Sequence, residues 1–425
     1  MSRVDPEPSG SEHLNVAALH AILDGPGLDV EILTPSGGRA SLVARIEGSD
    51  PSAPSLALLA HTDVVPAEDT GWIHDPFGGD LIDGEVWGRG AVDMLNQTSA
   101  MALAVRQLAD EDFKPRGSLT FLAVPDEECG GRRGMKPLVE QYPDEVLADF
   151  VLSEVGGAVQ RNSSGVPVIE AYVAEKGMMT VVITVRGIPG HTSIPWGSSN
   201  AIVRCAEVVR RIEAYRPPTG ISEEWSMWVA AQEFDQSLTA ALLDEAKLWE
   251  LLPTLDPELA RTAHACCHRT VVPAIVTGGE KMGTIPDSVC LKVHVRQLIG
   301  EEPEEVLQEL RTVLSGIVDE ADIISTSVIP GTRSNRDNQL WPVLEAVASA
   351  RHPGARLLPS LLPAQTDARW LRPTGATVYG FGVLSDRVSR NEYWSRFHGR
   401  NERIDLASLE LSHQGWIDVC REFLT

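Results

Sequence analysis

Side chains that can bind metals and move protons recur along this chain where apolar runs end. Two imidazoles and several carboxylates are typical ligands of zinc and similar divalent ions, and one carboxylate can bridge two ions about 3.5–4 Å apart. Any one of these residues alone would fit a hydrogen-bonded core position. Because so many occur in the same context, we predict a metal centre built from His61, Asp63, Asp93, Glu127, Glu128, Glu154 and His398.

Hydrolysis at such a centre needs a carboxylate that acts as the general base, in addition to the carboxylates that bind the metal ions. The tandem pair Glu127 and Glu128 offers it, because neighbouring residues project differently. One of them can bind metal while the other stays free as the general base. His61 and Asp63 are two residues apart on a predicted strand and share a face. Asp63 can therefore accept the spare N–H of His61 and fix the orientation of its ring.

The elements expected to position these residues alternate between strands and helices. SLALLAHTDVV (55–65) and GSLTFLAVPDEE (117–128) are apolar runs with polar ends, and NQTSAMALAVRQLADE (96–111) between them has helical spacing. This alternation predicts an α/β fold with a mixed, mostly parallel sheet flanked by helices. Ligands bind at the carboxyl ends of such strands. Those ends hold His61, Asp63, Asp126, Glu127 and Glu128.

A second pattern begins at Gly177. It predicts a compact ferredoxin-like βαββαβ domain, with strands at 178–187, 271–279, 288–298 and 321–329 and helices at 198–215 and 301–317. We expect this domain, residues 177–331, to be inserted into a catalytic metal-binding domain made of residues 1–176 and 332–425. The acidic stretch 216–270 contains Trp and Leu residues, and we expect it to be a helical elaboration of the inserted domain.

Composition narrows the possible partners and location. At 425 residues, the chain is longer than a protein with a single ordinary hydrophobic core. The 60 acidic residues against 36 basic residues give a net charge of -24, which disfavours nucleic acid and anionic membranes as partners. No apolar run approaches the roughly 18 residues of a membrane span, and the start lacks signal-peptide features. We therefore expect a cytoplasmic protein. The six scattered cysteines include the pair in HACCH (264–268), to which we assign a structural role.

Several segments together resemble one family in order and over nearly the whole chain. The family is that of the co-catalytic zinc exopeptidases and deacylases, which includes aminoacylase, acetylornithine deacetylase, succinyl-diaminopimelate desuccinylase, glutamate carboxypeptidase and carboxypeptidase S. The resemblance implies a metal-dependent hydrolase that cleaves an amide bond of a peptide or an N-acyl amino acid. The matching segments are LLAHTDVVPAE, WIHDPFGGDLIDGEVWGRGAVDM, PDEECGG, SEVGG, GIPGHTSIP, TDARWL and FHGRNERI.

The resemblance also implies roles for individual residues. It implies two divalent metal ions, zinc in the first place, with cobalt or manganese as alternatives. His61 and Glu154 would bind one ion, Glu128 and His398 the other, and Asp93 would bridge them. Glu127 would be the general base and Asp63 the partner of His61. A cis peptide bond after Asp93 is a further expectation.

Two expected site residues lie in the inserted domain. His191, in GHTSIP, resembles a histidine that reaches the active site of a neighbouring subunit and stabilises the oxyanion. That role requires a homodimer formed through the inserted domain. Arg296 resembles the arginine that binds the substrate carboxylate through a bidentate pair. Without the resemblance, they would be interpreted as a helix-entry histidine and a strand-end surface arginine.

The chain departs from the family pattern at two places. Gly283, in MGTIPD, stands where relatives usually have an asparagine that helps hold the substrate, and MLNQ follows Asp93 where a lysine-glycine pair is common. A substrate without an α-carboxylate would not need the asparagine. This leaves open an alternative in which the same metal chemistry acts on a non-peptide substrate, as in a deaminase. A non-catalytic binding protein is the third hypothesis, although such a protein would be expected to have lost ligands or the base.

Overall fold

A computed structural model describes residues 12–36, 38–68 and 70–425. Its large sheet is mixed, as predicted, and contains both parallel and antiparallel strand pairs. The sheet order is β1 (Asp29–Ser36), β2 (Arg39–Ile46), β6 (Leu119–Val124), β3 (Leu56–His61), β7 (Phe150–Ser153), β18 (Thr377–Gly380), β9 (Pro167–Glu175) and β16 (Thr332–Arg333). Strands β8 (Val159–Arg161) and β17 (Arg356–Leu362) also pair with β9.

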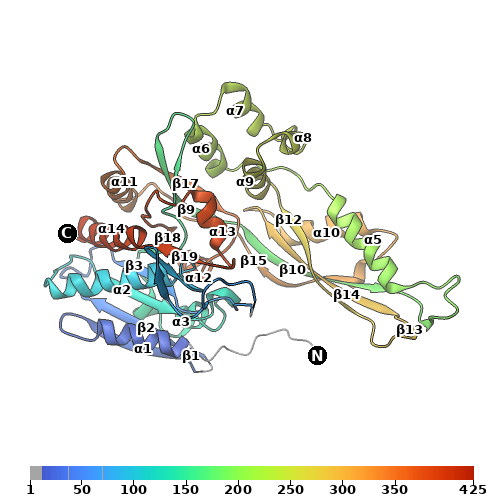
Figure 1. The fold of residues 1–425 in the computed structure, drawn as a ribbon, viewed down its shortest axis with the longest axis horizontal. Coiled ribbons are helices and arrows are strands. Elements are labelled where there is room, and N and C mark those ends of the chain that lie inside the picture. Colours follow the sequence, from blue (N-terminus) through green and yellow to red (C-terminus); the bar gives the residue numbers. More distant parts are fainter. Residues whose placement is uncertain (1–11, 37, 69) are drawn as a thin grey trace.

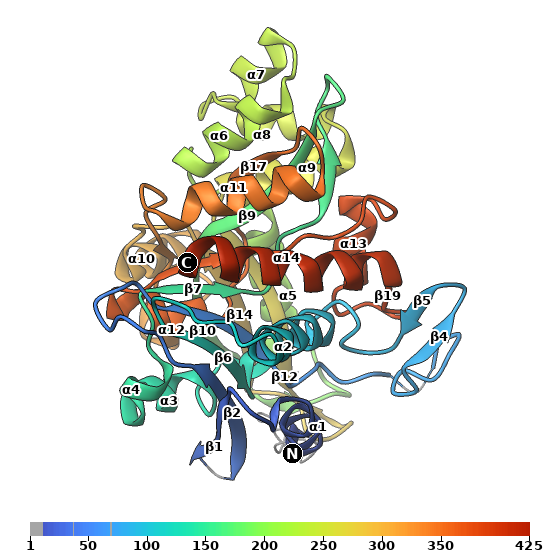
Figure 2. The same ribbon diagram turned by 90° about the vertical axis from the view of Figure 1, so that its left-hand side faces the viewer.

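Helices cover both faces of the large sheet (Figure 1). Figure 2 shows α11 (Leu340–Arg351), α14 (Leu406–Leu424) and α2 (Leu95–Asp110) as one layer, and α1 (Glu12–Leu23) contacts α2. The opposite face is covered by α3 (Met135–Gln141), α4 (Pro143–Val146) and α12 (Ala368–Leu371). In β3, Leu56 and Leu58 pack in the core beneath α2, α11 and α14, while Ala57 and Leu59 pack in the core beneath α3, α4 and α12. This explains the unbroken apolar run that precedes His61.

The small sheet has the predicted βαββαβ order of elements. Its strands run in the order β12 (Thr270–Gly278), β14 (Ser288–Gln297), β10 (Gly177–Arg186) and β15 (Ile323–Ile329), all antiparallel. Helices α5 (Ala201–Ala214) and α10 (Pro303–Leu314) cover one face and form a separate core with it. The short pair β11 (Gly190–His191) and β13 (Thr284–Ile285) is a separate ribbon, which projects at the right of Figure 1.

Segment 216–270 is helical, as predicted, but it packs differently from our expectation. It contains α6 (Glu223–Gln232), α7 (Gln236–Leu242), α8 (Leu248–Leu251) and α9 (Pro257–Cys267). Its buried side chains, among them Trp225, Trp228 and Cys266, join the core of the large sheet, and α6 contacts β17. The expectation that it elaborates the small sheet was wrong, because an amphipathic helix indicates an apolar face without specifying the surface that covers it.

The remaining elements are a small sheet and the helix that precedes His398. β4 (Asp80–Ile82), β5 (Glu85–Trp87) and β19 (Arg403–Asp405) form a small antiparallel sheet, and α13 (Arg390–Arg396) precedes His398. All six cysteines are free, and none belongs to a metal-ligand cluster among the described residues. Within the same ranges, no helix combines the length and apolarity needed to cross a bilayer.

Candidate active site

Two groups of metal-ligating side chains meet at Asp93. In the first group, His61 Nε2 lies 3.2 Å from Asp93 Oδ1 and 3.5 Å from Glu154 Oε2. In the second, His398 Nε2 lies 3.0 Å from Asp93 Oδ2 and 3.1 Å from Glu128 Oε2. Within each group the ligand atoms lie within 4.8 Å of one another. Each oxygen of Asp93 therefore faces a different group, which is the arrangement that a carboxylate bridging two ions requires.

Three neighbouring parallel strands deliver most of these side chains. His61 ends β3, Glu127 and Glu128 follow β6, and Glu154 follows β7. Because β3 pairs in parallel with both β6 and β7, the carboxyl ends of the three strands meet at one edge. Asp93 comes from the loop before α2, and its bond to Met94 is cis, as expected.

The backbone at Asp93 is held by a residue that the sequence analysis did not single out. Glu402 Oε1 accepts hydrogen bonds from the backbone N–H groups of Val92 (2.8 Å) and Asp93 (3.1 Å). Its other oxygen pairs with Arg89 at 2.8 Å. Glu402 is fully buried. Its carboxylate therefore fixes the loop that carries Asp93.

His61 is oriented by the backbone of Asp63 rather than chiefly by its carboxylate. Nδ1 of His61 lies 2.9 Å from the Asp63 carbonyl oxygen and 3.7 Å from Asp63 Oδ1. A carbonyl only accepts hydrogen bonds, so Nδ1 is the donor, and Nε2 is the ring nitrogen directed at the first group. The Asp63 carboxylate accepts from the backbone N–H groups of Glu127 and Glu128, both at 3.1 Å. Asp63 thus links the segment after β3, next to His61, to the segment after β6 that carries Glu127 and Glu128.

The electrostatics of the two groups favour a bound cation. Burial alone would lower the pKa of His61, but the nearby carboxylates Glu154 and Asp93 outweigh it and raise that pKa well above its usual value. Hydrogen bonds to Asp93 and Glu128 raise the pKa of His398 to about 10. Among the described residues, the buried Glu128 Oε1 has no hydrogen-bond partner. Excess buried negative charge and an unused carboxylate oxygen fit a site for divalent cations.

Glu127 lies beside the ligand groups but belongs to neither of them. Its Oε1 accepts a hydrogen bond from Arg369 Nη2 at 2.6 Å, and the same nitrogen lies 3.2 Å from the Glu127 carbonyl oxygen. Burial raises the pKa of Glu127 well above its usual value. Arg369, in the segment TDARWL, is a further site residue to which the sequence analysis gave no role. A charged side chain inside a short apolar helix was the available signal.

Arg296 lies at the same cavity, and His191 does not. The cavity, of about 530 Å³, is lined by Asp93, Glu127 and Arg296 among others. The Arg296 Nη1 atom is buried and has no hydrogen-bond partner in the described part of the chain. His191 is exposed on the projecting ribbon, where its Nδ1 accepts hydrogen bonds from Ser193 N (3.1 Å) and Oγ (2.7 Å). The Gly283 carbonyl accepts from Thr192 N at 3.2 Å on this ribbon.

The family model described as Peptidase family M20/M25/M40 matches residues 57–422. The chain belongs to this family. The expected resemblance, the fold class and the enzyme class, a hydrolase of amide bonds, are confirmed with it. The two groups of side chains that could hold metal ions, both of which contain Asp93, are consistent with this family assignment.

Named relatives and solved structures agree with the family assignment. The chain is 30% identical over 393 residues to the N-fatty-acyl-amino acid synthase/hydrolase PM20D1 of Xenopus tropicalis, covering 90% of this chain and 75% of the relative. It is 27% identical over 358 residues to a probable succinyl-diaminopimelate desuccinylase of Staphylococcus aureus, covering 82% and 79%. The M20 metallo-carboxypeptidase Sso-CP2 of Sulfolobus solfataricus has the same fold, with a TM-score of 0.72, 16% identity and coverage of 97% and 93%.

Proposed function

We propose that this protein hydrolyses the amide bond of an N-acyl amino acid with the help of two zinc ions. The observation that supports this most strongly is the pair of ligand groups sharing Asp93, with the buried Glu127 beside them and outside both. The relatives named as acting on acyl amino acids, PM20D1 and the desuccinylase, support an acyl amino acid over a plain peptide.

The ligand assignment follows the two groups. His61 and Glu154 would hold one ion, Glu128 and His398 the other, and Asp93 both. Imidazole and carboxylate ligands suit zinc, and cobalt or manganese would accept the same set. When bound, such ions lower the pKa of a water molecule and polarise a carbonyl group.

Glu127 is the proposed general base and then general acid. Its carboxylate would take a proton from the attacking water and pass it to the leaving amine. The hydrogen bond from Arg369 to Oε1 holds this carboxylate in place and leaves its other oxygen for the proton. Asp63 would act indirectly, by positioning His61 and the backbone of Glu127 and Glu128.

Arg296 is the proposed anchor for the substrate carboxylate. Arg296 lines the same cavity as the ligands, and its buried Nη1 has no hydrogen-bond partner among the described residues. A guanidinium binds a carboxylate through two parallel hydrogen bonds. Since relatives use an asparagine where this chain has Gly283, we propose that Arg296 binds the carboxylate without that amide. A Cβ added at Gly283 would meet no heavy atom within 4 Å, so an asparagine can be introduced there to test this.

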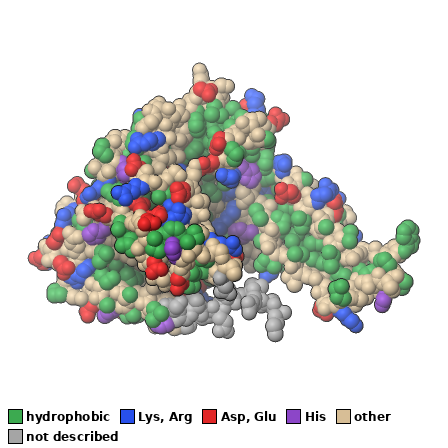
Figure 3. All heavy atoms as spheres, in the orientation of Figure 1, with side chains coloured by type: hydrophobic (Ala, Val, Ile, Leu, Met, Phe, Trp, Pro, Cys, Tyr) green, Lys and Arg blue, Asp and Glu red, His purple; other side chains and the backbone are tan. Residues whose placement is uncertain are grey.

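We propose that a homodimer brings His191 to the active site of a second subunit. The small sheet exposes an apolar surface in support of this, visible at the right of Figure 3. The surface comprises Ile202 and Val203 of α5 and Val272, Ile275 and Val276 of β12, each at least half exposed. β12 is an edge strand of its sheet, and exposed apolar edges are typical of interfaces. We also propose the division into a catalytic domain, 1–176 with 332–425, and an inserted domain, 177–331, of which segment 216–270 packs on the large sheet. A cytoplasmic location is likewise a proposal.

A substrate panel on the zinc-loaded protein tests the proposed function. We expect hydrolysis of N-acyl amino acids, measured by release of the free amine, and faster turnover than with dipeptides. The control is the same panel in excess chelator. Inactivity toward every acyl amino acid and dipeptide, with two metals bound, would contradict the proposal and favour a non-peptide substrate. Absence of bound metal would favour a binding protein.

A further inference from the structure

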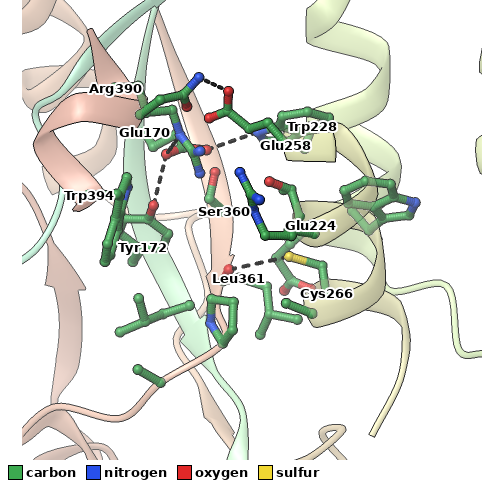
Figure 4. A pocket seen from close by; sticks show the side chains of 18 of the residues that line it. Glu170, Tyr172, Glu224, Trp228, Glu258, Cys266, Ser360, Leu361, Arg390 and Trp394 are labelled. Carbon is green, nitrogen blue, oxygen red and sulfur yellow. Dashed lines mark hydrogen bonds and ion pairs between the residues drawn. The ribbon is translucent and has the colours of Figure 1, made fainter. Parts of the chain in front are cut away.

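A second cavity adjoins the one at the ligand groups. It measures about 590 Å³ and lies between α6 and α9, strands β9 and β17, and α13 (Figure 4). The two cavities share the lining residues Leu362, Ala364 and Trp394. Trp394 stacks on Phe397, with ring centroids 4.8 Å apart, and Phe397 precedes the ligand His398. The second cavity is therefore next to the reacting centre and is a natural extension of it.

The helical segment 216–270 builds one wall of this cavity. On α9, Glu258, Thr262, Ala265 and Cys266 line it, a spacing that places them on one helix face. On α6, Trp225 and Trp228 line it, with stacked rings 5.1 Å apart. The segment therefore lines the cavity next to the active site with two indole rings of α6 and with a mixed face of α9.

The buried polar groups of the lining are already paired with one another. Glu170 accepts hydrogen bonds from Trp228 Nε1 (2.9 Å), Tyr172 OH (2.8 Å) and Arg390 Nε (2.7 Å), as Figure 4 shows. Glu224 pairs with Arg333 at 3.1 Å. Because these polar groups already have hydrogen-bond partners within the protein, they do not need a polar ligand. The indole and aliphatic surfaces of the lining favour an apolar ligand.

We propose that this cavity is the acyl subsite and holds an extended, apolar acyl chain of the substrate. The inference rests on the proposed hydrolysis of N-acyl amino acids and specifies the acyl group. The scissile amide would lie at the ligand groups, with Arg296 at the carboxylate and the acyl chain running past Trp394 toward α9. The exposed Arg261 has no ion-pair partner in the described ranges, so an acidic acyl tail is the competing occupant.

The test compares acyl groups on one amino acid in the zinc-loaded protein. Lengthening the acyl group from acetyl to decanoyl should raise kcat/KM about three- to fourfold for each methylene until the cavity is full. Ala265→Trp fills the cavity from α9, and Thr262→Phe fills it with a smaller side chain. Both should flatten the length dependence and leave acetyl turnover within about twofold of the wild type.

A matched control comes from the same segment. Ala240 is exposed on α7 and does not line the cavity. Ala240→Trp should keep the full length dependence. Calorimetric titration with 1-decanol gives a readout that does not depend on turnover. The wild type and Ala240→Trp should bind it, and Ala265→Trp should not.

The possible outcomes distinguish a failure of the proposed acyl subsite from a failure of the proposed function. A flat length dependence in an enzyme that cleaves acetyl amino acids would overturn the subsite and leave the proposed function intact. Faster cleavage of N-succinyl than of N-butanoyl substrate would overturn the apolar chain in favour of an acidic tail at Arg261. Decanol binding with no cleavage of any acyl amino acid would contradict the proposed function, and the assignment of the cavity to an acyl group with it.

Discussion

The ligand groups and the projecting ribbon of β11 and β13 differ in the contacts that position their proposed site residues. Asp93 is 7% exposed and its backbone is fixed by Glu402, which lies more than three hundred residues away in sequence. His191 is exposed, and its ring contacts only Ser193, two residues away, among the hydrogen bonds described. The ligand groups are thus held in position by contacts within this chain. His191 on the ribbon would need contacts from a second subunit to act on a substrate.

This difference identifies which proposed roles belong to one chain and which need two. Every proposed metal ligand, together with Glu127 and Arg296, lines or adjoins one cavity. His191 does not line it. If His191 takes part in catalysis, a second subunit must bring it there, and the apolar surface on α5 and β12 is the proposed contact.

The largest expected effect is at Glu127. Glu127→Gln keeps the shape of the side chain and removes its ability to accept a proton, so kcat should fall by about 10²–10⁴-fold. The metal content should stay at the wild-type value, because Glu127 belongs to neither ligand group. Turnover and metal analysis on the same sample check this. Wild-type turnover, or loss of both metals, would refute the assigned role.

The next largest effect concerns His191. His191→Asn should lower kcat by about 10²–10³-fold through loss of oxyanion stabilisation. Mixing this variant with Glu127→Gln, followed by unfolding and refolding together, should restore roughly a quarter of wild-type activity. Half of the dimers would be mixed, and each mixed dimer would have one complete site.

Separate refolding of each variant is the control for the mixing experiment. Ile275→Glu should prevent recovery, because it places a charge on the proposed apolar contact, and sedimentation should then report monomers. Recovery without dimers, or a fully active His191→Asn enzyme, would remove the cross-subunit role.

The smallest effects concern stability, and two matched glycine substitutions compare the regions. A Cβ at Gly134, seven residues after Glu127 in the chain, would lie 1.8 Å from the Pro125 carbonyl oxygen. A Cβ at Gly283, on the ribbon, would meet no heavy atom within 4 Å. Gly134→Ala should lower the free energy of unfolding by about 1–3 kcal/mol. Gly283→Ala should change it by less than about 0.5 kcal/mol. Equal effects in denaturant titrations would contradict the contrast in packing.

The sequence was sufficient to predict the grouped ligands for a physical reason. His61, Glu128 and Glu154 end or follow neighbouring apolar strands, so their type and position were enough to place them at one sheet edge. Arg369 and Glu402 were missed because their partners, Glu127 and the Asp93 backbone, are 242 and 309 residues away. No local pattern specifies such pairs.

The packing of segment 216–270 was missed for a related reason. The helical spacing of Trp225, Trp228 and Val229 predicts an apolar face, but either sheet could have covered it. In the fold it packs against β17 and joins the core of the large sheet. This packing also builds the cavity that we assign to the acyl chain.

The most direct test of the two-metal centre is anomalous X-ray diffraction from crystals of the zinc-loaded protein. We predict two peaks about 3.5–4 Å apart, one beside His61 and Glu154 and the other beside Glu128 and His398, with Asp93 between them. A single peak, or peaks away from Asp93, would contradict the account.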